Sequence, residues 1–134
     1  MPKPITAVAP GFSWIESATG RALVGDALSP LAPHVFTTRD LRFSRPLDDP
    51  DYAALAETLG VSPTDVVRVR QVHGRVVVVV RPGEAIGAPP DADAIVSTDP
   101  TRAIAVHVAD CVPVLIADRG CRVVAAIHAG WRGT

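Results

Sequence analysis

The sequence predicts a folded domain built mainly of β-strands, with a single helix. Two observations favour this class. Of the 134 residues, 48% are hydrophobic and 20% are charged, which is enough apolar material to bury a core and argues against global disorder. Apolar and β-branched runs also dominate the second half of the chain, whereas one segment alone shows convincing helical periodicity.

Prolines divide the first fifty residues into short segments, because a proline has no backbone donor and interrupts regular structure. Short strands are therefore expected there, over 13–17, 21–25 and 34–39. The helix is expected over 48–60, where acidic residues stand at the start and Gly60 supplies a C-terminal stop. Apolar residues recur within it at helical spacing: Tyr52, Leu55, Ala56 and Leu59.

A second strand-rich part follows the helix. Residues 66–80 are rich in valine and predict a strand that is broken near Gly74. A proline-rich loop is expected over 81–94. We find no internal repeat, low-complexity tract or interdomain linker, so residues 1–134 are treated as part of a single domain.

The last two apolar runs, 103–118 and 121–130, are joined by an Arg-Gly pair and predict a hairpin. A turn of two residues (119–120) or of four (118–121) places Cys111 directly opposite His128, on one face of the sheet. A turn of three residues would break this register. Side chains paired in this way are close enough to share a metal or to form a nucleophile and its base.

Charge and cysteine content exclude several classes of protein. The formal net charge is −1 and no basic face is evident, which argues against nucleic-acid and membrane partners. The N-terminus has no continuous apolar segment of the signal-peptide kind. Two cysteines do not make a secreted disulfide framework, so we expect a cytoplasmic protein with reduced thiols, in which Cys121 is a simple strand thiol.

Three residues at backbone irregularities could hold a metal: His73 beside a glycine, Cys111 shortly before a proline, and His128 at the start of "HAGWRG". Two imidazoles and a thiolate suit tetrahedral zinc with an open fourth position. The paired spacings of a structural zinc finger and the zinc-deaminase signature are both absent. The alternative from the residues alone is a buried cysteine and two hydrogen-bonded histidines without a metal.

The motifs "HVFTTR", "RQVHG", "DADAIVST", "VADCVPVLIAD" and "AAIHAGWRG" occur in the order and approximate spacing of a known family. Over about residues 34–134 the chain resembles the YfiH-like, laccase-domain family of purine nucleoside phosphorylases, formerly described as multicopper polyphenol oxidases. The resemblance implies an α+β fold with mixed sheets and packed helices. It also implies that His73, Cys111 and His128 are the metal ligands.

Five further residues are candidates for the site. Arg39 and Arg132 could bind a phosphate or ribose oxygen, although a solvated arginine is the ordinary reading of each. Gln71 is expected to share a strand face with His73, either as a donor to a substrate or as an ordinary polar residue of the strand. Asp110 is interpreted as a catalytic proton carrier, and Asp93 either as a carboxylate that orients a ligand imidazole or as a turn cap.

The remaining histidines, His34 and His107, are expected to be structural. His107 stands four residues before Cys111, so on a straight strand it would share the face of Cys111 and serve as a reserve ligand. Trp131 could form a stacking edge next to Arg132, or fill the core.

The resemblance implies zinc-dependent phosphorolysis of purine nucleosides, with nucleoside and phosphate as partners and adenosine deamination as a related activity. A copper-dependent polyphenol oxidase, a metal-free Cys111/His128 hydrolase and a non-catalytic fragment remain as alternatives. Members of the family are longer than this chain. We therefore expect an N-terminal portion of one metal-binding domain, and either self-association or packing against a second half; the sequence leaves open whether this portion is active by itself.

Overall fold

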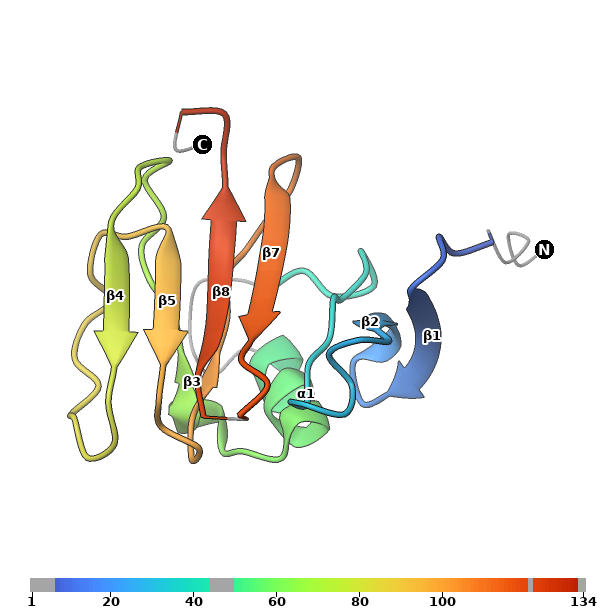
Figure 1. Cartoon of the computed structure of the whole chain (residues 1–134), viewed down its shortest axis with the longest axis horizontal. Helices are drawn as coiled ribbons and strands as arrows, with labels where there is room; N and C mark the ends of the chain where they lie inside the picture. Colours follow the sequence, from blue (N-terminus) through green and yellow to red (C-terminus); the bar gives the residue numbers. More distant parts are fainter. Residues whose placement is uncertain (1–6, 44–49, 121, 133–134) are drawn as a thin grey trace.

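The computed structural model describes residues 7–43, 50–120 and 122–132. That part of the chain forms three small sheets and one α-helix (Figure 1). In chain order the elements are β1 (Phe12–Ser17), β2 (Gly20–Gly25), α1 (Pro50–Leu59), the 3-10 helix η1 (Pro63–Asp65), β3 (Val66–Val67), β4 (Val77–Val80), β5 (Ala94–Ser97), β6 (Ala103–Ile104), β7 (Val112–Ala117) and β8 (Val124–Ala129). The predicted α+β class with mixed sheets is confirmed.

The largest sheet has four strands in the order β4-β5-β8-β7. β4 and β5 are parallel, whereas β8 runs antiparallel to both β5 and β7, so the sheet is mixed. The other two sheets have two strands each, β1 with β2 antiparallel and β3 with β6 parallel. In Figure 1 the four long strands stand side by side, and the β1–β2 hairpin lies beyond α1 at the right-hand end.

The core lies on one face of the four-stranded sheet. Val67, Val80 and Ile95 form one buried cluster, which brings β3 against β4 and β5. A second cluster joins α1 to β3 through Leu55, Ala56 and Val66. Each fully buried aliphatic side chain contributes about 1.5–3 kcal/mol by leaving water.

The opposite face of the same sheet carries the alternate side chains of each strand. We call it the open face and define it by these residues: Val77, Val79, Ala94, Val96, Val112, Val114, Ile116, Ala125, Ile127 and Ala129. In Figure 1 the four strands are seen flat-on, and no described helix is drawn in front of them.

The predicted helix is confirmed at α1, with residues 48 and 49 of the expected range outside the described residues. Gly60 closes it with φ 74°, a conformation that a glycine adopts at no steric cost. The N–H of Gly60 donates to the carbonyl of Glu57, and the N–H of Val61 donates to the carbonyl of Ala56. These two bonds are the Schellman motif that satisfies the last carbonyls of a helix.

No helix in the described ranges has the length and apolar character required to cross a membrane.

The strands predicted over 13–17 and 21–25 are confirmed as β1 and β2. The strand predicted over 34–39 is wrong, because the structure has there a single bridge between Phe36 and Leu23. The His34 ring explains the interruption: its Nε2 accepts the N–H of Gly25, and its Nδ1 lies 2.9 Å from the carbonyl of Ala32. Hydrogen bonds of the His34 side chain thus replace the backbone hydrogen bonds of a strand pair, in keeping with the structural role expected for His34.

Two long predicted strands are each split. The range 66–80 contains β3 and β4 but no strand between them, and 103–118 contains β6 and β7 with residues 105–111 outside either. Gln71 joins the two segments that lie between these strands. Its side-chain amide donates to the carbonyl of His107 and accepts the N–H of the same residue. These contacts replace a strand ladder, which the sequence pattern alone could not indicate.

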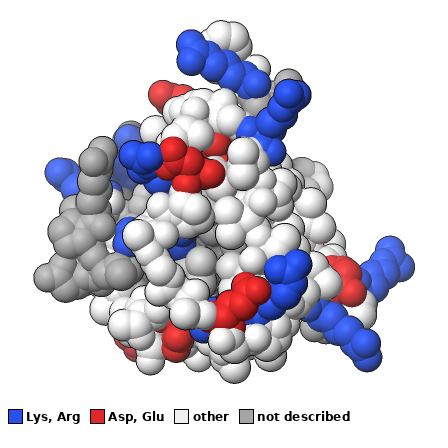
Figure 2. Space-filling view, turned by 90° about the vertical axis from the view of Figure 1, so that its left-hand side faces the viewer, with Lys and Arg blue, Asp and Glu red and all other residues white. Residues whose placement is uncertain are grey.

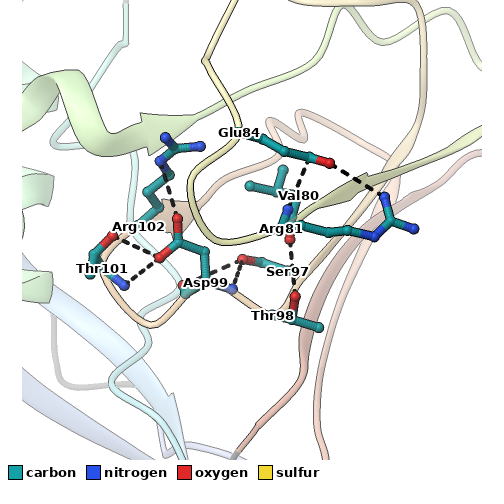
Figure 3. A network of polar contacts seen from close by, with 8 residues as sticks. All are labelled: Val80, Arg81, Glu84, Ser97, Thr98, Asp99, Thr101 and Arg102. Atoms are coloured by element: carbon teal, nitrogen blue, oxygen red, sulfur yellow. Dashed lines mark hydrogen bonds and ion pairs between the residues drawn. The ribbon is translucent and has the colours of Figure 1, made fainter.

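β5 was not predicted, since its four residues follow directly on the proline-rich loop. It is the strand that β4 and β8 both pair with. Figure 3 shows how the chain turns after it: the carboxylate of Asp99 accepts the N–H and hydroxyl of Thr101 at 2.9 and 2.7 Å and pairs with Arg102 at 3.3 Å. The hydroxyl of Ser97 accepts the N–H of Asp99 at 3.1 Å.

The predicted hairpin exists, but its register differs by two residues. Pro113, not Cys111, lies opposite His128. The turn is longer than two residues because the Asp118 carboxylate accepts the N–H groups of Arg122 and Val123, both at 2.8 Å. Cys121, predicted to be a strand thiol, lies outside the described residues.

Pro113 lies inside β7, although a proline cannot donate a backbone hydrogen bond. The proline is tolerated because β7 is an edge strand. In addition, His128, the residue opposite, needs no backbone donor from position 113. The N–H of His128 points to the other neighbour and donates to the carbonyl of Asp93 at 2.7 Å.

Candidate metal centre

The "QVHG" segment turns sharply at His73, which adopts φ 58°. This left-handed conformation is uncommon outside glycine and persists only where surrounding contacts hold it. Here the contacts come from Asp93, whose carboxylate accepts the N–H groups of Val72, His73 and Gly74 at 3.2, 2.9 and 2.8 Å. One buried carboxylate therefore shapes the loop that presents the His73 ring.

The same carboxylate also orients His128. Its Oδ1 lies 2.8 Å from Nδ1 of the ring, and the two side chains are 3% and 4% exposed. A hydrogen bond at Nδ1 leaves Nε2 available for another partner. Asp93 was interpreted either as a turn cap or as a carboxylate orienting an imidazole, and its hydrogen bonds serve both purposes.

The surroundings of Asp93 favour its ionised form. Burial opposes ionisation, but the hydrogen bonds from His128 and from the N–H groups of Gly74, Val72 and His73 outweigh it. The pKa of Asp93 therefore lies below its usual value. A carboxylate inside the fold is compatible with this site because so many donors converge on it.

Cys111 reaches His128 in spite of the altered register. Cys111 directly precedes β7 and lies two residues before Pro113, the residue opposite His128. Its ligand atom and those of His73 and His128 all lie within 4.8 Å of one another. The rings of His73 and His128 meet edge to face, with centroids 4.8 Å apart.

Gly130 has no side chain, and this leaves room for the side chains of His73, His128 and Cys111 to approach one another. A Cβ atom at this position would lie 3.1 Å from Cδ2 of His73, 3.6 Å from Cε1 of His128 and 3.7 Å from Sγ of Cys111. Sequence reasoning did not single out Gly130 as a site residue. The signal was present, because a glycine directly after a strand often marks a close approach of the backbone to other groups.

The three residues line a cavity of about 370 Å³ together with Gln71, His107 and Asp110. Asp110 is exposed at this cavity, where a proton carrier would have to be. The amide of Gln71 already bonds the backbone of His107 at 2.6 and 2.7 Å. The expected strand alternation of Gln71 with His73 is wrong, because residues 68–76 are not in a strand.

His107 forms a wall of this cavity and is not one of the grouped ligands. Its Nε2 lies 2.8 Å from the Tyr52 hydroxyl, and its ring stacks on the Tyr52 ring with centroids 6.0 Å apart. Burial of the ring, together with the positive charge of Arg68, lowers the pKa of His107 below its usual value. These contacts explain the structural role that the sequence indicated.

Two predicted substrate-binding residues lie elsewhere. Arg39 is exposed, and Arg132 is exposed with its guanidinium 4.8 Å above the ring of Trp131. Neither lines the cavity within the part of the chain that the structure describes. Trp131 is 78% exposed, so it fills no core and forms a stacking edge with its neighbour.

The fold and the grouped ligands can be compared with known proteins. Residues 49–134 match the family described as multi-copper polyphenol oxidoreductase laccase. The chain belongs to this family. The resemblance seen in the motifs is thereby confirmed, and the laccase-family match includes all three candidate ligands.

The curated relatives of this chain are named for a different activity from the one in the family's description. A purine nucleoside phosphorylase of Synechocystis is 50% identical over 132 residues, covering 92% of this chain and 46% of the relative. A purine nucleoside phosphorylase of Deinococcus radiodurans is 39% identical over 118 residues, covering 76% and 45%. The chain thus spans less than half the length of these two relatives.

Solved structures agree on the fold. The Bacillus licheniformis hypothetical protein YfiH superposes with a TM-score of 0.74 at 23% identity, over 93% of this chain and 54% of that one. The Neisseria meningitidis protein NMB0706 gives a TM-score of 0.56 at 30% identity, over 92% and 52%.

Proposed function

We propose that this chain carries the metal-binding half of a zinc-dependent purine nucleoside phosphorylase, which acts on a purine nucleoside and phosphate. The observation that carries the proposal is the meeting of one thiol and two imidazoles, within 4.8 Å, at a cavity. The names of the Synechocystis and Deinococcus relatives supply the reaction class.

The residues present fit zinc. Bonds of about 2.0–2.3 Å place tetrahedral ligand atoms about 3.3–3.8 Å apart, so a modest inward rotation of these side chains suffices. His128 already has the hydrogen-bonded Nδ1 that metal-binding histidines require, with Asp93 as its partner. The thiol calls for a compartment that keeps cysteines reduced, and we place the protein in the cytoplasm.

Zinc held there supplies a Lewis acid that polarises a phosphate or water oxygen for attack. The chain's own residues do the rest. Asp93 fixes the orientation of His128 and the backbone that carries His73. Asp110 is the exposed carboxylate at the cavity and accepts or returns a proton during the reaction. The cavity volume is in the range of small-ligand sites.

Adenosine deamination is part of the proposal as a related activity. Release of the base and loss of the amino group both need an oxygen nucleophile and a proton carrier near a purine. One cavity that holds His73, Cys111, His128 and Asp110 offers groups for both reactions.

A metal-free Cys-His-Asp hydrolase is the second candidate, and a specific geometry favours it. Asp93 would orient the ring, His128 would be the base and Cys111 the nucleophile. The Asp93 carboxylate lies 2.8 Å from Nδ1 of His128, and the Cys111 sulfur lies within 4.8 Å of a nitrogen of the same ring. Copper oxidase chemistry has less support. The described residues contain one group of three ligands, and a multicopper cluster needs more histidines than the four in this sequence.

Zinc binding is tested on this chain by equilibrium dialysis and elemental analysis, with one zinc per chain expected. Activity is tested on a chimera that joins this chain to the unmatched half of the Synechocystis relative. We expect phosphate-dependent release of base from inosine or adenosine, lost on chelation and restored by zinc. Cys111→Ser should abolish both readouts, whereas His34→Gln, a histidine outside the cavity, should leave zinc bound.

Other outcomes contradict the proposal. Copper in place of zinc, with oxidation of phenols, would support the laccase description. Activity that survives chelation but is lost on alkylation of Cys111 would support the hydrolase.

A further inference from the structure

The open face is the unexplained surface of this molecule. Val112, Ile116 and Val77 on it are 60%, 51% and 52% exposed. On the other face of the same strands, Val80 and Ile95 are 7% and 0% exposed. Soluble proteins rarely leave a contiguous apolar surface of this kind in water unless something binds to it.

The composition of the open face is that of a covered surface. Every residue that defines it is valine, isoleucine or alanine, and none is polar. Sheets with one solvated face alternate apolar with polar residues, whereas strands covered on both faces are apolar throughout. β4 and β5 are parallel, an arrangement that natural sheets bury on both sides.

Charge does not mark this region for a charged partner. Figure 2 looks at the edge of the sheet from the β4 side, where basic and acidic side chains are separated by uncharged surface. The open face itself contributes no charged residue. Its partner must therefore bind through apolar side chains.

The lengths of the relatives indicate the partner. The match to the Synechocystis relative takes in 92% of this chain but 46% of that protein. The fold shared with the Bacillus licheniformis protein takes in 93% of this chain but 54% of that one. More than half of the Synechocystis relative and nearly half of the Bacillus licheniformis protein therefore lie outside the shared part.

We propose that the open face is the docking surface for a polypeptide equivalent to this unmatched half of the relatives, which covers the sheet with apolar side chains. The surface lies on the opposite side of the sheet from His128, because Ala129 and Ile127 belong to the open face and His128 does not. The proposal is independent of the metal and of the reaction.

The test is to co-express this chain with the unmatched half of the Synechocystis relative as a separate polypeptide. We expect a one-to-one complex in size-exclusion chromatography with light scattering. Hydrogen exchange should show amides of β7 and β4 protected in the complex relative to this chain alone, which requires no variant.

Ile116→Lys and Val112→Lys should abolish the complex, because each buries a charge in an apolar contact. Ile86→Lys is the matched control: Ile86 is 43% exposed but lies in the loop between β4 and β5, outside the residues that define the open face. Zinc binding by the lysine variants shows that they remain folded.

Two results would overturn the proposal. One is a homodimer of this chain that the lysine variants convert to a monomer, since a second copy would then be the partner. The other is a chain that neither binds the unmatched half nor shows slower exchange in β7 and β4.

Discussion

Oδ1 of Asp93 accepts the N–H of His73 and also lies 2.8 Å from Nδ1 of His128, so one buried oxygen joins two of the three candidate ligands. Residues 73 and 128 are far apart in the sequence, and their relative position depends on this contact. The carboxylate belongs to the "DADA" motif at the start of the central strand β5.

Asp93→Asn should weaken both the fold and the metal site. The side-chain amide cannot accept from all the N–H groups that now face a carboxylate, and one of its own N–H groups would point at a donor. We expect a loss of about 2–4 kcal/mol in the free energy of unfolding, measured in urea. Zinc affinity should fall about 10–100-fold.

Asp91→Asn is the control for that substitution. Asp91 lies two residues away and pairs with Arg70 at an exposed position. An exposed pair of this kind contributes little, so stability and zinc affinity should stay near those of the natural sequence. Equal effects of the two substitutions would show that Asp93 has no special part in the site.

Gly130→Ala should spare the fold but disturb the site. The added methyl would lie 3.1 Å from Cδ2 of His73, which must move by a few tenths of an ångström. We expect the zinc affinity, measured by competition with a chelator, to fall about tenfold. Gly87→Ala is the matched control, because a Cβ there meets nothing within 4 Å; an equal loss in both variants would contradict the role of Gly130.

Gln71→Leu should lower the stability of the fold. It removes both hydrogen bonds between the side chain and the His107 backbone, and we expect a loss of about 1–2 kcal/mol in the free energy of unfolding. The sequence interpretation, in which Gln71 donates to the substrate, predicts instead a raised KM with unchanged stability. Urea unfolding of the chain and kinetics of the chimera separate the two.

Acid should destabilise the fold partly through Asp99. Hydrogen bonds from the hydroxyl and the N–H of Thr101 lower the pKa of Asp99 below its unfolded value of about 3.9. The resulting stabilisation is complete above about pH 5 and is lost as the pH falls through the folded pKa. In urea unfolding at pH 6 and pH 3, Asp99→Asn should lose less stability on acidification than the natural sequence; an equal loss would exclude Asp99 as a contributor.

The sequence alone was sufficient where the signal is local. Helical spacing and Gly60 predicted α1, because a helix and its Schellman end are made by residues a few positions apart. Two apolar runs joined by an Arg-Gly pair likewise predicted the β7–β8 hairpin. The grouping of His73, Cys111 and His128 was also expected from local irregularities and from the motifs, and the structure brings their ligand atoms together.

Tertiary structure decided what depends on contacts between distant residues. The hairpin register was set by Asp118 in its turn, the break after β3 by Gln71 and His107, and the turn at His73 by Asp93. Arg39 does not line the cavity, and the strand expected over 34–39 is a single bridge at Phe36. Periodicity records which way a side chain faces, whereas hydrogen bonds formed across 19–36 residues determine where a strand stops and which loops meet.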